Sequence, residues 1–298
     1  MTTIKTYGTA GAFRVALEER LRRRSQLDGI DINRLRRQVS FDRLLARLFR
    51  GDSVPWALKG GYALELRFKA ARSTVDIDLT LQRVVTAAIE GVDVNQAVRE
   101  ILQSAVGYPL GDWFEYTIGS AMMDITAAPY GGARYPVEVH MDGRIFARFH
   151  LDVGIGDALM QPLETVITND WLAFAGIERP RVLLISREQQ FAEKIHAYTL
   201  PRNTPNSRVK DLVDLALLIG GELDQQRILD ALHLTFDRRG THPLPTALDA
   251  PSPEWMIPFQ TLADRVPLGD AARPPTANSS KLSKAFAPRR RRSPGRDP

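Results

Sequence analysis

Apolar residues recur at helical spacing over residues 8–50 and predict two helices there. Asp31 stands at the N-cap position of the second helix, because Ile32, Leu35 and Val39 follow it at helical spacing. The opposite face of this helix is basic and carries Arg34, Arg37, Arg43, Arg47 and Arg50. We therefore expect Arg-rich helices ahead of the first strand.

The pattern then changes to short alternating runs, typical of strands, with helical runs between them. The predicted elements are a strand at 54–59, a helix at 61–69, a strand at 74–81, a helix at 87–105 and strands within 112–126 and 135–153. The last region reads as a hairpin around Met141-Asp142-Gly143. A three-residue loop would pair Val139 with Ile145 and Val137 with Ala147, whereas a two-residue loop would bring Val137 to Arg148. We favour the three-residue loop.

From Ser186 onward the helical period returns, beginning with a capping-box pattern of Ser186 and Gln189. Three helices are predicted, and Trp255 and Phe259 mark a fourth. Residues 268–298 are rich in Pro, Ser and Arg and predict disorder. The expected organisation is an α+β domain at 1–185 with a mixed sheet, an α-helical domain at 186–267 and a disordered basic tail at 268–298.

The composition excludes several classes of site and location. The 298 residues include no cysteine, which excludes disulfides, thiolate nucleophiles and Cys-ligated metals. No apolar run is long enough to span a bilayer or form a signal peptide, so we expect a cytoplasmic protein.

Charge is distributed unevenly along the chain. Residues 1–50 carry 12 basic and 5 acidic residues, and residues 271–298 carry 8 basic and 1 acidic, a net +7 each. The total of +5 leaves −9 for the middle (5 − 14 = −9). An acidic centre between basic ends suits a cation site flanked by arms that bind a polyanion; solvated helix faces and a disordered tail are the alternative.

Asp76 and Asp78 lie one residue apart on a predicted strand, so their side chains share a face with Cβ atoms roughly 6–7 Å apart. Two such carboxylates can clamp divalent cations, and a two-metal site usually needs a third, for which Asp152 is the candidate. Upstream, Gly60-Gly61 would let backbone N–H groups approach a phosphate at a helix N-terminus, beside Lys59. Taken alone, an Asp-x-Asp pair is more often a solvated strand face than a metal site, and a Gly-Gly pair is more often an ordinary turn than a phosphate cradle.

Several motifs occur in one order: "LKGGYALELRF", "STVDIDL", "FHLDVGIGDAL", "AEKIHAY", "RVKDLVDL" and "RGTHPLP". Together, over roughly residues 30–265, they resemble the AbiEii/AbiGii-type nucleotidyltransferase toxins of the DNA-polymerase-β-like superfamily, a group that includes the mycobacterial MenT toxins. The resemblance implies the toxin of a toxin–antitoxin pair. It also implies transfer of a nucleotide from an NTP to the 3′ acceptor end of tRNA, which blocks translation.

The resemblance also implies roles for individual residues. Asp76, Asp78 and Asp152 would bind Mg²⁺ or Mn²⁺, Asp152 would help to deprotonate the acceptor, and Lys194 and Asp214 would complete the catalytic set. The implied nucleotide-binding residues are Lys59, Gly60, Gly61, Arg67, Arg208, Lys210 and Asp211. The implied partners are tRNA, an NTP and an antitoxin, with the chain a monomer. Without the resemblance, Lys194 reads as a lysine of an amphipathic helix, and Lys210 with Asp214 as a surface ion pair on one helix face.

One position departs from the superfamily pattern: Tyr62 follows Gly61 where a serine is usual. A second feature is regulatory, because phosphate on Thr74 or Ser73 would add negative charge next to Asp76. His140, His150 and His196 show no zinc-site spacing and are expected on strands or a helix face. Two other functions stay open: nucleotide transfer to a protein hydroxyl, and non-catalytic binding of an NTP or a partner.

Overall fold

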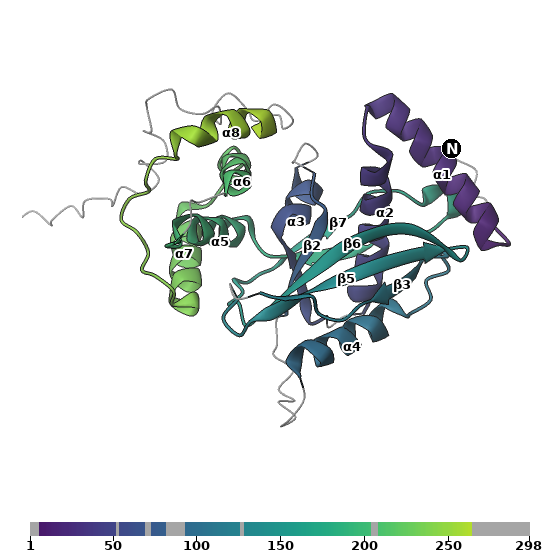
Figure 1. Cartoon of the computed structure of the whole chain (residues 1–298), viewed down its shortest axis with the longest axis horizontal. Coiled ribbons are helices and arrows are strands. Elements are labelled where there is room, and N and C mark those ends of the chain that lie inside the picture. Colours follow the sequence, from purple (N-terminus) through teal and green to yellow (C-terminus); the bar gives the residue numbers. More distant parts are fainter. Residues whose placement is uncertain are drawn as a thin grey trace, which may run out of the picture.

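An eight-stranded mixed sheet runs through the middle of the protein, as seen in the computed structural model of the chain (Figure 1). The structure describes residues 6–51, 54–68, 73–81, 93–125, 128–203 and 208–263. The strand order is β3-β5-β6-β2-β1-β8-β7, and β4 pairs with β5. The strands are β1 (Trp56–Lys59), β2 (Asp76–Leu81), β3 (Glu115–Ile118), β4 (Met123–Asp124), β5 (Gly132–Met141), β6 (Arg144–Ile155), β7 (Glu164–Ile167) and β8 (Arg181–Leu184).

Four helices come before or between the early strands. They are α1 (Ala10–Asp28), α2 (Ile32–Leu48), α3 (Gly60–Arg67) and α4 (Val94–Val106). The two helices predicted within 8–50 are confirmed, and the Asp31 side chain accepts the N–H of Arg34 at 2.9 Å as an N-cap. The predicted helix at 87–105 begins only at Val94, and residues 82–92 lie outside the described part.

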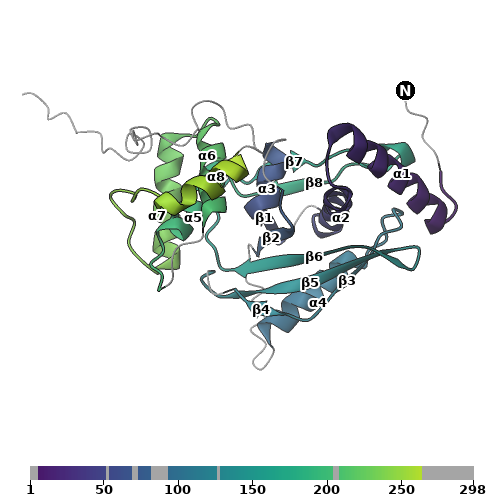
Figure 2. The ribbon, with the colours of Figure 1, turned by 45° about the horizontal axis from the view of Figure 1, so that its top comes forward.

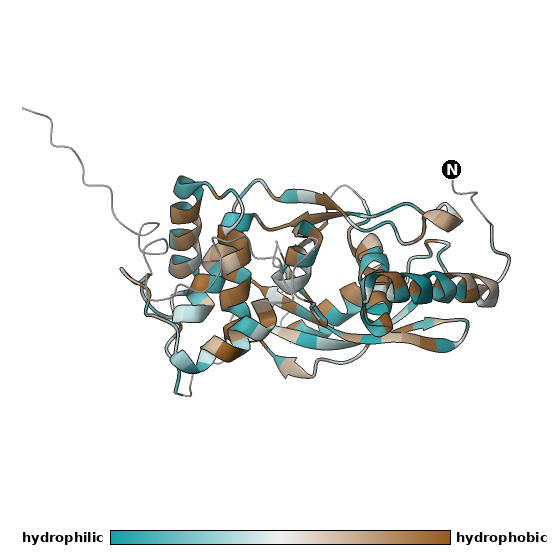
Figure 3. Cartoon of the chain, turned by 90° about the horizontal axis from the view of Figure 1, so that it is seen from above, coloured by the Kyte–Doolittle hydropathy of each residue, from teal (hydrophilic) through white to brown (hydrophobic). Residues whose placement is uncertain are grey.

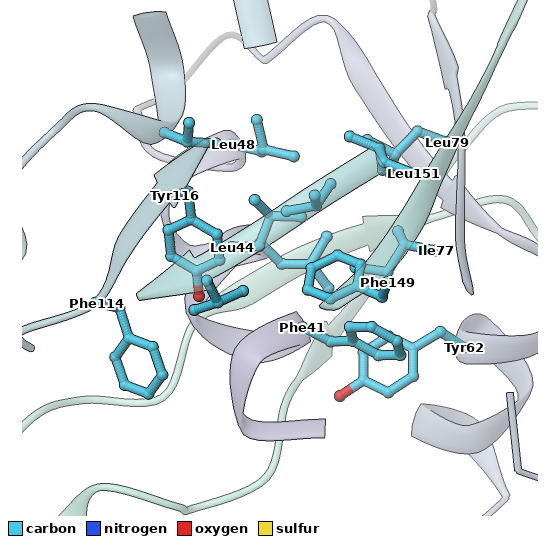
Figure 4. Packing of buried hydrophobic residues seen from close by; sticks show 14 of the residues in the cluster. Phe41, Leu44, Leu48, Tyr62, Ile77, Leu79, Phe114, Tyr116, Phe149 and Leu151 are labelled. Carbon is cyan, nitrogen blue, oxygen red and sulfur yellow. The ribbon is translucent and has the colours of Figure 1, made fainter. Parts of the chain in front are cut away.

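One face of the sheet is apolar and packs against these helices. Ile77, Leu79 and Leu151 lie in this core, and the Phe41 ring contacts those of Tyr62 and Phe149 with centroids 4.9 and 4.7 Å apart (Figure 4). Because successive side chains of a strand point to opposite faces, this packing commits the alternate residues of β2 and β6 to the other face. Those alternate residues are Asp76, Asp78 and Asp152.

The predicted basic face of α2 is only partly exposed to solvent. Arg43 and Arg47 are almost fully buried, and both bind the buried carboxylate of Asp112 at 2.6 Å. Arg47 also donates to the carbonyl of Phe114 at 2.8 Å. These two guanidinium groups attach α2 to the segment before β3, because a buried charge needs a charged and hydrogen-bonded partner. They are therefore not available to bind a polyanion.

The three-residue hairpin loop is also wrong. The loop between β5 and β6 has two residues, Asp142 and Gly143, with φ of 56° and 65°, as a type I′ turn requires. A β-bulge at Val139 then shifts the register, so that Val139 pairs with Ala147 and Val137 with Phe149. This shift decides which β5 side chain lies beside Asp152.

The C-terminal helices form a second packed group, at the opposite end of the molecule from α1 (Figure 2). They are α5 (Arg187–Thr199), α6 (Val209–Ile219), α7 (Gln225–Arg239) and α8 (Met256–Ala263). Ser186 caps α5 as predicted, accepting the N–H of Gln189 at 3.1 Å. Brown apolar turns alternate with teal polar turns along these helices (Figure 3). Their apolar residues pack on one another and on Leu64 of α3, which joins this group to the sheet domain.

Two strands, β7 and β8, were not predicted from the sequence. Strand β8 pairs in parallel with β1 and leads directly into α5, so it sets where the C-terminal helices begin relative to the sheet. None of the described helices is long and apolar enough to cross a membrane. The tail at 268–298 lies outside the described residues, so its predicted disorder stays a prediction.

Candidate functional site

A row of four charged residues crosses the polar face of the sheet. The row consists of Lys59 on β1, Asp78 on β2, Asp152 on β6 and Arg134 on β5, each the register partner of the next. Partners on neighbouring strands have their side chains on the same face, about 5 Å apart at the backbone. The order of charge is therefore positive, negative, negative, positive, and the two carboxylates lie side by side at the centre.

Asp76 joins this row from the next outward-facing position of β2. Its Oδ1 lies 3.1 Å from Nδ1 of His150, its register partner on β6, and its Oδ2 lies 3.4 Å from Nη2 of Arg134. Arg134 also donates to both oxygens of Asp152, from Nε and from Nη2, at 2.7 Å each. The structure thus brings together the three carboxylates that the sequence predicted, and adds Arg134 and His150.

Gly60 allows the backbone to approach Asp78 closely. A Cβ at Gly60 would lie 1.9 Å from Oδ2 of Asp78, and the φ of Gly60 is +67°. Only glycine can meet both requirements, since a side chain disfavours this φ and would also collide with the carboxylate. Burial, and then the neighbouring charge of Asp152, raise the pKa of Asp78 to about 6. A cation beside Asp78 would oppose both effects.

Lys59 is held between two carboxylates. Its Nζ lies 2.5 Å from Asp157, in the turn after β6, and 3.6 Å from Glu193 of α5. Arg239 of α7 binds the same two carboxylates, at 3.0 and 3.6 Å. Burial alone would lower the pKa of Lys59, but the charges of Glu193 and Asp157 outweigh it and raise that pKa. Lys59 is therefore a fixed positive charge next to Asp78.

Lys194 of α5 is likewise held between two carboxylates. Its Nζ donates to Asp211 at 2.7 Å and to Asp214 at 2.6 Å, both on α6. Burial would lower the pKa of Lys194, but Asp214 and Asp211 raise it. Lys194 also acts electrostatically on Asp78, whose pKa it lowers. Because an ammonium group has three N–H donors, each of these lysines keeps one beyond its two carboxylates.

Three of the predicted nucleotide-binding residues do not gather at the row. Arg67 is almost fully buried and binds Glu164, Gln190 and the carbonyl of Ile185, so its guanidinium has a structural role. Arg208 binds Asp211 at 3.0 Å, and Asp211 in turn binds Lys194 at 2.7 Å. Lys210 is exposed, whereas Asp214 is fully buried and binds Lys194, so the alternative reading of Lys210 and Asp214 as a surface ion pair is wrong for Asp214.

The Tyr62 side chain does not face Asp76, Asp78 or Asp152. Its ring is fully buried, and its hydroxyl lies 2.5 Å from Oδ1 of Asp42 on α2. Tyr62 therefore occupies the sequence position of the usual serine, but its hydroxyl contacts Asp42 and not the site. Gly61 is buried next to it. The N-terminus of α3 is therefore anchored from the core side, and its backbone is the part that can approach a ligand.

The remaining predicted residues lie around this site. Ser73 is exposed, and the Thr74 hydroxyl lies 3.3 Å from the backbone carbonyl of Asp76, so the predicted phosphorylation site stays a prediction. His140 and His150 are on strands, as expected. His196 of α5 is buried and bonds Thr241 at 2.9 Å. Burial, followed by Arg239, lowers its pKa to about 4, which keeps His196 neutral.

The donors of the row fit a hard divalent cation by their chemistry. Three carboxylates on one face supply the oxygen ligands that Mg²⁺ and Mn²⁺ prefer. In the described part of the chain, however, no three acidic or histidine side chains converge to hold an ion as they stand. Arg134 instead bridges two of the three carboxylates, Asp76 and Asp152.

Sequence reasoning missed four charged residues of this site: Arg134, Asp157, Glu193 and Arg239. Glu193 directly precedes Lys194, and Arg239 begins the "RGTHPLP" motif, so both lay inside segments already singled out. Alternation along β5 would have put Arg134 on the polar face, but the expected hairpin register did not pair Arg134 with Asp152. Asp157 also lay inside a quoted motif, "FHLDVGIGDAL", but it follows the strand end and its pairing with Lys59 was not expected.

Comparison with known proteins gives the family. A family model described as "Nucleotidyl transferase AbiEii toxin, Type IV TA system" matches residues 43–286. MenT4, a nucleotidyltransferase toxin from Mycobacterium tuberculosis, is similar in structure, with a TM-score of 0.56 at 18% identity, over 91% of this chain and 88% of that one.

A second similar structure is JHP933 from Helicobacter pylori, with a TM-score of 0.46 at 14% identity, over 86% of this chain and 94% of that one. No curated protein sequence gives a significant match. The similarity to MenT4 confirms the predicted α+β nucleotidyltransferase fold. The family model covers most of the chain, and the chain therefore belongs to the AbiEii family of nucleotidyltransferase toxins of type IV toxin–antitoxin systems.

Proposed function

We propose that this toxin transfers a nucleoside monophosphate from an NTP to the 3′ acceptor end of tRNA and thereby blocks translation. The observation that carries the proposal is the pair of central carboxylates, Asp78 and Asp152, together with the fixed charges of Lys59 and Lys194, which both act on Asp78. Carboxylates bind the ion and activate the acceptor, and lysines bind phosphate. The site thus has both halves of what phosphoryl transfer needs.

Each residue has a role in this proposal. Asp76, Asp78 and Asp152 would hold Mg²⁺ or Mn²⁺, which when bound supplies positive charge to the phosphates and acidifies the acceptor hydroxyl. Asp152 lies at the centre of the row, where it would accept the proton of that hydroxyl. Lys59 and Lys194 would each donate the remaining N–H to phosphate oxygens and stabilise the charge that develops on the leaving pyrophosphate.

The buried carboxylates around the two lysines have positioning roles. Asp211 and Asp214 hold Lys194, while Asp157 and Glu193 hold Lys59, so neither ammonium loses much rotamer entropy when it binds phosphate. Gly60 and Gly61 open the start of α3 to the nucleotide, as proposed from the sequence. Arg208 and Lys210 flank Asp211 and would act at the edge of the nucleotide site.

The wider biological setting follows from the family and the fold. Family membership implies an antitoxin partner. We further propose that the protein is a cytoplasmic monomer that binds tRNA through shape and phosphate contacts. The polar face of α1 and the basic residues of 268–298 would contribute to that binding, whereas Arg43 and Arg47 would not, because they are buried.

The proposal is tested by incubating the protein with total tRNA, Mg²⁺ and each α-labelled NTP in turn, followed by a denaturing gel. We expect label on tRNA with at least one NTP, and a loss of at least about a thousandfold in Asp76→Ala and Asp78→Ala. Arg148→Gln is a matched control, because Arg148 lies on the same hairpin and pairs only with Glu138 among the described residues. Label on protein instead of RNA would favour the protein-hydroxyl alternative, and no label with any NTP would favour non-catalytic binding.

A further inference from the structure

Arg134 occupies the part of the carboxylate cluster where a cation is needed. Its Nε and Nη2 each lie 2.7 Å from one oxygen of Asp152, and Nη2 lies 3.4 Å from Oδ2 of Asp76. A two-pronged contact between guanidinium and carboxylate is the strongest pairing available to an arginine. In the described part of the chain, the hydrogen-bond partners of this side chain are these two carboxylates.

These contacts already engage most of the carboxylate oxygens that could bind a metal ion. Arg134 takes both oxygens of Asp152 and one of Asp76, and His150 lies 3.1 Å from the other oxygen of Asp76. Of the three carboxylates, only Asp78 makes no hydrogen bond to a described side chain. A divalent ion bridging the three would have to share or displace the bonds to Arg134, and it would meet the repulsion of that guanidinium at short range.

The surroundings of Arg134 permit such an exchange. Its side chain is 28% exposed, while the buried arginines Arg47 and Arg67 are 2% and 5% exposed. It lies on β5, opposite Met123 of the short strand β4, and Met123 is exposed. The guanidinium can therefore turn toward solvent without opening the core. The buried arginines have no such route.

We propose that Arg134 is a positioning residue that occupies Asp76 and Asp152 as a resident cation until a divalent ion displaces it. This inference rests on the proposed function, since it concerns the ion used by that site. It follows that the protein alone binds Mg²⁺ or Mn²⁺ weakly. The ion binds firmly only together with the NTP, whose phosphate oxygens add ligands and charge. Arg134 also keeps Asp76 and Asp152 close together while no ion is bound.

The inference is tested by measuring Mn²⁺ binding to the nucleotide-free protein, by calorimetry and by the electron paramagnetic resonance signal of free Mn²⁺. We expect Arg134→Gln to bind Mn²⁺ at least about tenfold more tightly than the wild type, because one positive charge near the ion is removed. Arg134→Lys keeps the charge and should stay within about threefold of the wild type. Arg148→Gln removes the same charge farther along the hairpin and should leave the affinity unchanged.

The results separate this inference from the proposed function. If Arg134→Gln binds Mn²⁺ no more tightly than the wild type, or if neither binds it, Arg134 does not compete with the ion and the inference is overturned, even if tRNA is labelled. If Arg134→Gln gains affinity while no NTP labels any RNA, the inference stands and the proposed acceptor is wrong. Tighter binding in both Arg134→Gln and Arg134→Lys would show that contact geometry, not charge, limits the affinity, which also overturns it.

Discussion

Asp42 is a buried carboxyl group among neutral hydrogen-bond donors. Its oxygens accept the hydroxyl of Tyr62 at 2.5 Å, the indole N–H of Trp171 at 2.8 Å and the backbone N–H of Asn169 at 3.2 Å. These bonds favour the ionised form, but burial outweighs them and raises the pKa of Asp42 to about 7. Through these hydrogen bonds, Asp42 links α2 to α3 and to the loop after β7.

The raised pKa of Asp42 determines whether the free energy of unfolding rises or falls with pH. Between about pH 4 and about pH 7 the unfolded chain has lost the proton of Asp42, while the folded protein keeps it. Stability should therefore fall as pH rises through this window, by up to about 1.4 kcal/mol per pH unit from this group, and level off above it. Urea denaturation of the wild type and Asp42→Asn across pH 4–8 measures the difference, and equal slopes in the two proteins would contradict the assignment.

Lys194 and Asp214 have separable roles in stability and activity. Lys194→Met removes the cation that binds Asp211 and the fully buried Asp214, and should cost about 3–5 kcal/mol of unfolding free energy as well as the transfer activity. Lys194→Met combined with Asp214→Asn also removes a buried negative charge, so it should recover much of the stability but none of the activity. Denaturant titration and the tRNA-labelling reaction report the two effects, and wild-type activity in Lys194→Met would contradict a phosphate-binding role.

At the scale of elements, alternation along two strands was sufficient to predict the carboxylate face. Val75 to Leu81 alternates strictly, and the apolar flanks of Asp152 fix its direction in the same way. The glycine pair before α3 was predictable as well, because glycines followed by a helical period mark a strand-to-helix turn. These signals are local, and local signals are what a single sequence carries best.

Arg134 shows why the rest of the site could not be predicted. With the expected three-residue loop, the hairpin register would pair Gly132 with Asp152. In the structure, the two-residue loop and the bulge together shift the register, so that Arg134 pairs with Asp152 instead. One extra residue in a strand thus decides whether a cation meets Asp152, and nothing in the hairpin sequence specifies that bulge. Strands β7 and β8, of four residues each, were not predicted either.

At the scale of the whole molecule, buried charges join the sheet to the C-terminal helices. Lys59 of β1 and Asp157 after β6 form one network with Glu193 of α5 and Arg239 of α7. Each member comes from a different element, and Lys59 and Arg239 are 180 positions apart, so sequence spacing gave no sign of the contact. The network holds Lys59 beside Asp78, and Lys194 of α5 acts electrostatically on the same carboxylate.

The basic residues of 268–298 lead to a prediction for the intact chain. Residues 271–298 hold eight basic residues and one acidic residue. If they bind tRNA phosphates, deleting 268–298 should weaken tRNA binding and reduce the salt dependence of the affinity. The slope should fall by about 0.7–0.9 for each phosphate that the shortened chain no longer neutralises. Fluorescence anisotropy with labelled tRNA over a range of salt concentrations measures both quantities.

Replacing Arg289 to Arg292 by lysine separates charge from sequence in that experiment. Lysine keeps the charge, so this variant should retain the slope of the full chain, because counterion release depends on how many phosphates are neutralised. The row of Asp76, Asp78 and Asp152 is untouched in both variants, so labelling at saturating tRNA should persist. An unchanged slope after deletion would mean that 268–298 does not bind phosphate. Since Arg43 and Arg47 are buried, the exposed arginines of α1, which include Arg22, Arg23 and Arg24, would then be the basic groups to test next for contacts with tRNA.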